Sequence, residues 1–204
     1  MRLAKPLTLA VLLLPLLLAA PAHAAGAADP RQFIQNLGDS VLGIFQNPEF
    51  TSAERERRLY AIAASLFDAA SIARFVLGRH WKTTPEQQQQ EFTKIFERYM
   101  VRIYVSRFTL YHDVDFEVIG SFPMSQTLTL VKTKIIPHDE KPAIKVEWII
   151  RRSVDTFKIS DVSVEGASQL LTLREEFAAV MAQGDDSVAY LIARLQEKLD
   201  EQPS

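Results

Sequence analysis

The sequence contains no cysteine, and its 204 residues include seven glycines and two tryptophans. Without cysteine the chain has no disulfide scaffold, no thiolate metal site and no cysteine nucleophile. The glycines are scattered, so no glycine-rich phosphate loop is present. The formal net charge is −2, and the absence of a basic block argues against nucleic acid as a partner. The fold must therefore be held together by apolar packing.

Common catalytic motifs are also missing. No two of the four histidines have the spacing of zinc ligands, and the segment 165–168 (EGAS) does not match the GxSxG nucleophile elbow. One enzymatic alternative stays open. Helices on a curved antiparallel sheet can form a cone-shaped pocket, as in small isomerases and dehydratases, and Asp161 or Glu165 could act there as acid or base. Either carboxylate could equally be exposed or bind a nearby backbone group.

The N-terminus has the three parts of a secretory signal peptide. Arg2 and Lys5 give a positive start, residues 7–20 are apolar apart from one threonine and one proline, and residues 22–24 (AHA) form a small-x-small cleavage pattern. The apolar run is shorter than the roughly 20 residues that a membrane-spanning helix needs. The sequence thus predicts a signal peptide over residues 1–24 and one domain over residues 25–204, exported to the periplasm.

The first part of this domain shows helical periodicity. Helix starts are predicted at Asp29-Pro30, near Thr51, at Asp68 and near Thr84. Gly78 is placed to end the third helix. The four glutamines at 87–90 read as the exposed first turns of the fourth and longest helix. The second half of that helix is apolar on more than one side, which predicts burial on two sides.

From Val114 onward the apolar period changes from helical to two. Four strands are predicted over residues 114–118, 126–136, 144–151 and 156–165. A helix over 168–183 follows, with Ser168 as its N-cap, and Asp185-Asp186 is predicted to cap a last helix. Consecutive strands with short turns indicate an antiparallel meander with one face covered by helices. The predicted fold class is α+β, a twisted antiparallel sheet of four or more strands packed by several helices around an apolar cavity.

Three blocks of sequence resemble a known family. Residues 76–104 (VLGRHWKTTPEQQQQEFTKIFERYMVRIY) resemble the signature of the MlaC / toluene-tolerance family of periplasmic lipid-binding proteins. The matching positions are Leu77, Gly78, Trp81, Thr84, Gln87, Phe92 and Phe96, then Asp161, Val162, Val164 to Gly166, Ser168, Arg174 and Phe177, and finally Leu191, Ile192 and 195–198. One departure is Phe157, which stands where the family usually has a tryptophan.

The resemblance implies a function without catalysis or cofactor. It implies a shuttle that carries a glycerophospholipid between the outer and inner membranes and so maintains the lipid asymmetry of the outer membrane. The implied partners are the phospholipid ligand, an outer-membrane lipoprotein–porin complex and an inner-membrane ABC transporter with its substrate-binding ring. A related branch is associated with hopanoids, so a hopanoid carrier stays open as an alternative. A periplasmic chaperone or adaptor is a further alternative.

The residues predicted to contact lipid were chosen by size, flexibility and alternation. They are Phe75, Val76, Phe96, Met100, Tyr104, Phe108, Leu130, Val146, Trp148, Ile150, Phe157 and Val164. Periodicity alone does not separate a side chain that fills a core from one that lines a cavity. The cations Lys94, Arg98 and Arg102 recur every four positions on the long helix, and a solvated face is the favoured interpretation.

Overall fold

A computed structural model describes residues 29–110, 113–153 and 156–201; the side chains of 108–110 are outside this description, as is the predicted signal peptide. The helices are α1 (Pro30–Gln46), α2 (Ser52–Leu66), α3 (Ala69–Leu77), α4 (Arg79–Thr83), α5 (Glu86–Leu110), α6 (Gln169–Ala182) and α7 (Val188–Asp200). The strands are β1 (Val114–Pro123), β2 (Leu128–Pro137), β3 (Ile144–Arg152), β4 (Phe157–Val164) and β5 (Ala167–Ser168).

The strands form one antiparallel sheet in the order β1-β2-β3-β4-β5. This confirms the predicted α+β class and meander; the two-residue strand β5 was not predicted. Side chains alternate between the faces of each strand. On β2, Val131 and Thr133 are buried on the inner face, opposite Trp148 and Val146 of β3. Leu130 therefore lies on the outer face.

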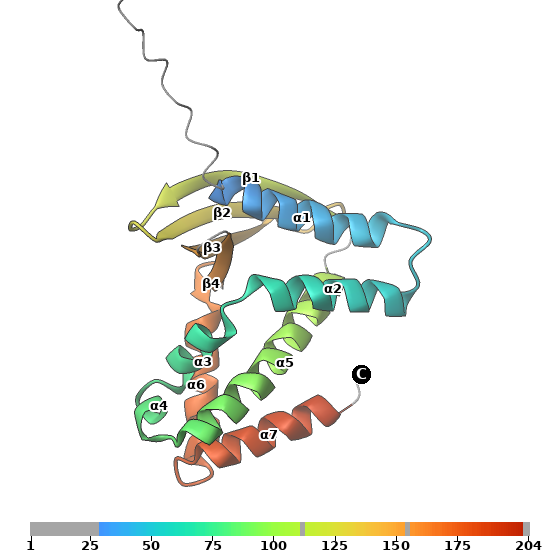
Figure 1. Ribbon diagram of the computed structural model, residues 1–204. Coiled ribbons are helices and arrows are strands. Elements are labelled where there is room, and N and C mark those ends of the chain that lie inside the picture. Colours follow the sequence, from blue (N-terminus) through green and yellow to red (C-terminus); the bar gives the residue numbers. More distant parts are fainter. Residues whose placement is uncertain (1–28, 111–112, 154–155, 202–204) are drawn as a thin grey trace, which may run out of the picture.

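The helices form two groups (Figure 1). Helix α1 lies along the inner face of the sheet against β1 and β2, and α2 lies beside α1 and contacts the end of β4. Helices α3, α5, α6 and α7 pack together at the other end of the molecule, where α5 contacts α2, α3 and α7. In the following, "the bundle" means α3, α5, α6 and α7.

Predicted helix caps are present at four starts. At each start the cap side chain accepts a hydrogen bond from a backbone N–H in the first turn: Asp29 from Arg31, Thr51 from Glu54, Asp68 from Ser71, and Ser168 from Leu171. Gly78 ends α3 with a φ of 54°, a left-handed value that glycine adopts without strain. The cap of α7 was predicted wrongly. Ser187 caps it, while Asp185 and Asp186 form the preceding turn with positive φ.

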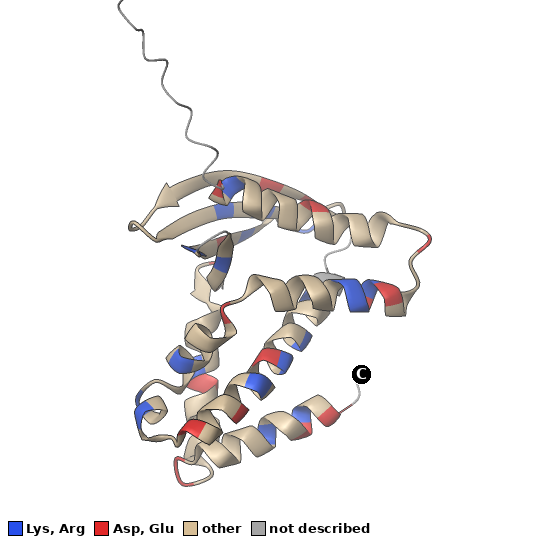
Figure 2. Ribbon diagram, viewed as in Figure 1, with Lys and Arg blue, Asp and Glu red and all other residues tan. Residues whose placement is uncertain are grey.

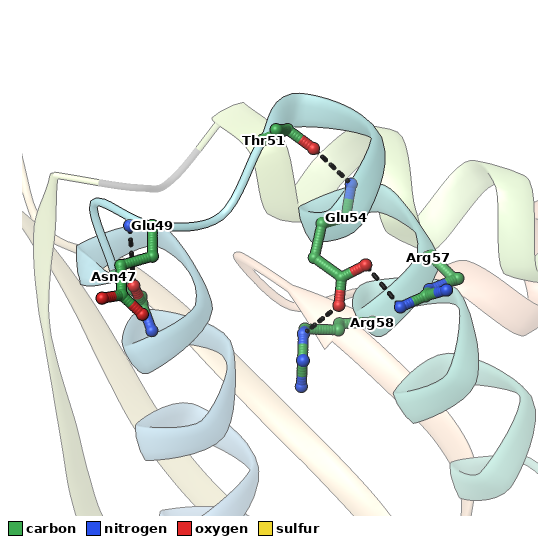
Figure 3. A network of polar contacts seen from close by, with 6 residues as sticks. All are labelled: Asn47, Glu49, Thr51, Glu54, Arg57 and Arg58. Atoms are coloured by element: carbon green, nitrogen blue, oxygen red, sulfur yellow. Dashed lines mark hydrogen bonds and ion pairs between the residues drawn. The ribbon is translucent and has the colours of Figure 1, made fainter.

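The connection between α1 and α2 is held by polar contacts (Figure 3). The side-chain oxygen of Asn47 accepts a hydrogen bond from the Glu49 N–H at 2.8 Å. One turn later, Glu54 pairs with Arg57 and Arg58 at 2.5 and 2.7 Å, and the Arg57 side chain is the main reason why the pKa of Glu54 is lowered. The Arg55 guanidinium donates to the Asn47 carbonyl at 3.1 Å and so links the first turn of α2 to the end of α1.

The stretch before α5 is more regular than expected. Residues 79–83, which connect the predicted third and fourth helices and include Trp81, form the short helix α4. The Gln89 amide donates to the carbonyls of Trp81 and Thr84 at 2.8 and 2.9 Å, so this glutamine ties α4 to α5 and is not simply solvated. None of the described helices is long and apolar enough to cross a bilayer.

Candidate functional site

An apolar cavity of about 60 Å³ lies between α1 and the sheet. Its lining is Leu37, Gly38, Val41 and Leu42 from α1, with Val114, Phe116, Ile135 and Trp148 from β1, β2 and β3. The helical spacing of the first set and the two-residue spacing of Val114 and Phe116 turn these side chains toward one another. The walls are hydrocarbon almost throughout, so the cavity suits an apolar group and offers no clamp for a charged one.

The closest approach of α1 to the sheet occurs at Gly38. A Cβ atom at this position would lie 2.2 Å from a ring carbon of Phe116. The absence of a side chain lets the Phe116 ring pack directly on the helix backbone. Gly43, one turn further along the same helix, has open space where its Cβ would be. Gly38 thus sets the spacing between α1 and β1, and hence the size of the cavity.

Trp148 on β3 forms the floor of the cavity, and its indole N–H is hydrogen-bonded within the sheet. Its indole Nε1 donates to the Thr133 hydroxyl at 2.9 Å, and that hydroxyl donates to the Val146 carbonyl at 3.1 Å. Thr133 is 1% exposed, so water does not replace either bond. This chain holds the indole at a fixed angle and leaves its hydrocarbon edge for the cavity.

A second cavity lies between α2, α3 and α5, but its volume is about 10 Å³. Its lining includes Ala63, Phe67, Ile72, Phe96 and Met100. Such a volume has room for about one water molecule. It is a packing defect in a tight region, with no room for a ligand.

The structure does not bring the predicted lipid-contacting residues into one site. Trp148 lines the α1–sheet cavity, and Phe96 and Met100 line the small one. Five others are buried in the core: Val76, Tyr104, Val146, Ile150 and Phe157. Val164 is half-buried, Leu130 lies on the outer face of the sheet, and Phe75 is exposed. The side chain of Phe108 lies outside the described residues. Most of these large apolar side chains fill the core.

The sequence analysis missed the wall contributed by α1. The apolar stripe of α1 includes Leu37, Val41 and Leu42. Its spacing predicts a helix but does not indicate what that helix packs against. Gly38 and Phe116 carry no sequence signal for their contact, because the contact depends on how the helix is placed on the sheet. The second half of α5 was predicted to be buried on two sides, against a core or a cavity, and Val101 and Val105 are buried there.

The carboxylates considered for catalysis are occupied by backbone donors. Asp161 accepts from the N–H groups of Val162 and Leu170 and from the Ser168 hydroxyl, which stabilises the start of α6. Glu165 accepts from the Lys145 N–H at 2.6 Å. Both carboxylates therefore bind nearby backbone groups, which is one of the two alternatives that the sequence left open. Burial raises the pKa of the Tyr104 hydroxyl well above its usual range. Among the described residues no cluster of metal-ligand side chains occurs.

Comparisons with known proteins agree with this architecture. A solved structure of the phospholipid-binding protein from Ralstonia solanacearum, in complex with a phospholipid, superimposes with a TM-score of 0.70 at 17% identity, covering 84% of this chain and 97% of that one. That likeness shows the fold. No match was found among curated proteins. The family model described as "MlaC protein" matches residues 35–197, which include the whole cavity lining. The chain therefore belongs to the MlaC protein family.

Proposed function

We propose that this protein is a periplasmic lipid-binding shuttle that holds the acyl chains of a glycerophospholipid between α1 and the sheet. The observation that carries the proposal is the apolar cavity between Leu37, Val41 and Leu42 on one wall and Phe116 and Trp148 on the other, in a chain of the MlaC family. The Ralstonia protein of the same fold was solved with a phospholipid bound, and we extend that ligand class to this chain.

Loading requires the cavity to expand. Pockets that enclose small ligands have volumes of roughly 300–1,000 Å³, whereas this one measures about 60 Å³. Helix α1 is the wall best suited to move, because its contacts with the sheet are mainly apolar and apolar contacts have no fixed direction. Its N-terminal end is linked to β1 by the Arg31 guanidinium, which donates to the Val118 carbonyl at 2.8 Å. We infer that α1 pivots about the fixed turn at residues 47–51.

The energetics suit a carrier that both loads and unloads. Burying a methylene group is worth about 0.8 kcal/mol, so a sixteen-carbon chain gains on the order of 12 kcal/mol relative to water. A bilayer gives the lipid a similar gain. A cavity with hydrocarbon walls and no polar clamp binds the chains about as well as the membrane does, and small changes at a docking site then decide the direction of transfer.

The predicted signal peptide supports a periplasmic location for one lipid-binding domain spanning residues 25–204. The shuttle then exchanges lipid with the outer-membrane lipoprotein–porin complex and with the inner-membrane ABC transporter and its substrate-binding ring. These partners and the role in outer-membrane lipid asymmetry are part of the proposal, and membership of the MlaC family supports them. The protein acts without catalysis, since transfer of a lipid between binding sites breaks no bond.

The test is to extract the purified protein and identify the released lipid by mass spectrometry. We expect a phospholipid in the wild type. Substituting Leu42→Trp should fill the cavity and remove most of that lipid, because Leu42 is half-buried in its wall. The matched control is Leu171→Trp on the surface of α6, where the leucine is 52% exposed; it should retain the lipid.

Other outcomes would identify the alternatives. A hopanoid in the extract would change the ligand class but not the cavity. A lipid-free protein that takes up no fluorescent phospholipid from donor vesicles would contradict the proposal, and suppression of aggregation of unfolded outer-membrane proteins would then favour the chaperone alternative. Equal lipid retention in Leu42→Trp and wild type would show that the chains lie elsewhere.

A further inference from the structure

The turn between β1 and β2 displays an apolar tip. Six large apolar side chains are exposed among the described residues, and three of them, Ile119, Phe122 and Met124, fall within six positions at this end of the sheet. Met124 is 55% and Phe122 is 50% exposed. Clustered exposure of this kind usually marks a contact surface, whereas isolated exposed apolar residues are ordinary. "The tip" below means residues 119–127.

The tip is held rigidly in this exposed arrangement. The Ser125 hydroxyl accepts hydrogen bonds from the N–H groups of Thr127 and Leu128 at 3.2 and 3.1 Å. The N–H groups of Met124 and Ser125 both donate to the Leu128 carbonyl. The side chain of Phe122 leans over Gly120, where a Cβ atom would lie 3.0 Å from its ring. These bonds fix the backbone of the turn and so set the positions from which the apolar side chains project.

Cations surround the tip. The Lys132 ammonium lies 5.8 Å from the centre of the Phe122 ring, and Arg151 pairs in register with Leu128, directly after the turn. The Arg152 N–H donates to the Thr127 carbonyl at 2.8 Å, which brings both exposed arginines beside the tip. In Figure 2 the β1–β2 turn at the left is tan, and blue segments lie on the strands beside it.

The described acidic groups near these cations are engaged locally. Glu147 pairs with Lys132 at 2.8 Å, and Asp29 caps α1, whose exposed Arg31 reaches the Val118 carbonyl. Asp155, between β3 and β4 in the sequence, lies outside the described residues. The exposed Arg152 guanidinium stacks over the Phe157 ring at 5.1 Å from its centre. Arg151 is left as an exposed positive charge next to an apolar projection.

We propose that the tip is a membrane-contacting surface that inserts its apolar side chains into the head-group region of an anionic bilayer. Apolar and aromatic side chains that enter the interface, together with cations that meet anionic head groups, are the two components of reversible interfacial binding. Charge complementarity favours an anionic lipid surface over a protein pocket. The tip lies on the outer side of the sheet, so binding there leaves the cavity under α1 untouched, and this inference does not depend on the proposed function.

Vesicle sedimentation tests the proposal with purified full chain. We expect binding to vesicles of phosphatidylcholine with phosphatidylglycerol and much weaker binding to phosphatidylcholine alone. Each exposed cation near a membrane contributes a several-fold gain in affinity, so Arg151→Glu/Arg152→Glu should weaken binding by about tenfold or more. Phe122→Ser/Met124→Ser should weaken it to a similar extent. Both variants should keep the wild-type circular dichroism and any lipid that co-purifies.

The chain offers matched controls for both changes. Lys94→Glu/Arg98→Glu makes the same change in charge on an exposed face of α5, and Tyr60→Ser/Leu171→Ser removes two exposed apolar side chains from α2 and α6. Neither control pair should alter vesicle binding. If the controls weaken binding as much as the tip variants do, the attraction is a property of overall charge or apolarity and the proposal is wrong.

A fluorescence measurement gives a second readout that needs no disruptive substitution. Because the chain has no cysteine, Gln126→Cys at the tip carries a single environment-sensitive dye, and Gln87→Cys at the start of α5 serves as its control. We expect the emission of the tip dye to shift to shorter wavelength on adding anionic vesicles, with no shift at position 87. No shift at the tip, or a dimer in sedimentation equilibrium that the tip variants disrupt, would overturn the proposal.

Discussion

The bundle and the α1–sheet layer are held together in different ways. In the bundle, the fully buried rings of Phe92 and Phe96 stack with centroids 5.5 Å apart, and Phe177 meets both edge-on. Arg102 adds three hydrogen bonds to the carbonyls at the end of α7, from 198 to 201. In the α1–sheet layer, apolar contacts dominate around the cavity of about 60 Å³, whereas the groove of about 480 Å³ between α5 and α7 is lined partly by charged side chains such as Lys94 and Arg98.

This difference separates a scaffold from an adaptable part. Interlocked aromatic rings and multiple directed hydrogen bonds permit one arrangement. Apolar contacts across a cavity permit several arrangements of similar energy, because losing one set of contacts is offset by gaining another. We therefore expect the bundle to dominate the free energy of unfolding and the α1–sheet layer to dominate ligand capacity.

The largest expected effect is in the bundle. Phe96→Ala removes a fully buried ring that touches Phe92 and Phe177, and should lower the free energy of unfolding by about 3–5 kcal/mol. Urea denaturation followed by circular dichroism measures the change, with Tyr60→Ala on the exposed face of α2 as control within about 0.5 kcal/mol. The ratio of bound lipid to folded protein should stay as in the wild type. A selective loss of lipid would place the ligand against α5 instead.

Gly38 provides the corresponding test of the α1–sheet layer. Gly38→Ala places a methyl group against the Phe116 ring and should destabilise the fold by about 1–3 kcal/mol through overpacking. Gly43→Ala is the matched control in the same helix. Its methyl group meets no atom within 4 Å, so it should stabilise the helix by up to about 1 kcal/mol. Thermal unfolding of both variants measures the contrast, and equal effects of the two would show that α1 does not pack closely on β1.

The buried hydroxyl under the cavity floor gives a smaller effect. Thr133→Val removes the acceptor of the Trp148 indole and should cost about 1–2 kcal/mol, because a buried donor is left without a partner. Adding Trp148→Phe should recover part of that loss in the double variant, which a double-mutant cycle by urea denaturation measures. Strict additivity of the two substitutions would mean that the hydrogen bond contributes nothing to the stability of the layer.

Features of the fold that depend on neighbouring residues were predicted from the sequence, whereas contacts between distant segments were not. Helix starts at Asp29, Thr51, Asp68 and Ser168, and the stop at Gly78, were predicted because each depends on side-chain chemistry within a few residues. The four main strands were predicted for the same reason, from alternation along a short segment. Family membership was also recognised, from motifs spread along the chain, and the family match over residues 35–197 confirms it.

Of the residues that line the α1–sheet cavity, only Trp148 was among those predicted to contact lipid, because the lining depends on contacts between distant segments. Gly38 meets Phe116 across 78 positions of sequence, and nothing local to either residue indicates the contact. Leu130 shows the effect of register, because the face that it occupies is set by the pairing of β2 with β3 and not by the sequence of β2 alone. The role of Arg102 in capping α7 was missed likewise; a repeating pattern of cations looks the same whether the side chains meet solvent or a neighbouring helix.

The smallest expected effect concerns the edge of the α1–sheet layer next to Val114 of the cavity wall. There the His138 ring contacts Asp113 at 2.8 Å and Asp115 at 3.1 Å, and so joins β2 to the start of β1. Hydrogen bonds to Asp115 and then to Asp113 raise the pKa of His138 above its usual value of 6.5. Because the folded-state pKa is the higher one, this contribution to stability is fully present below about pH 6.5 and is lost as the pH rises through the folded-state pKa.

His138→Gln should therefore lower the melting temperature slightly near pH 6 and hardly at all near pH 9. In an Asp113→Asn/Asp115→Asn background, the effect of His138→Gln on the melting temperature should not depend on pH. In the wild-type background, an effect that grows with rising pH would contradict the assignment. This edge of the layer would then be held by backbone pairing alone.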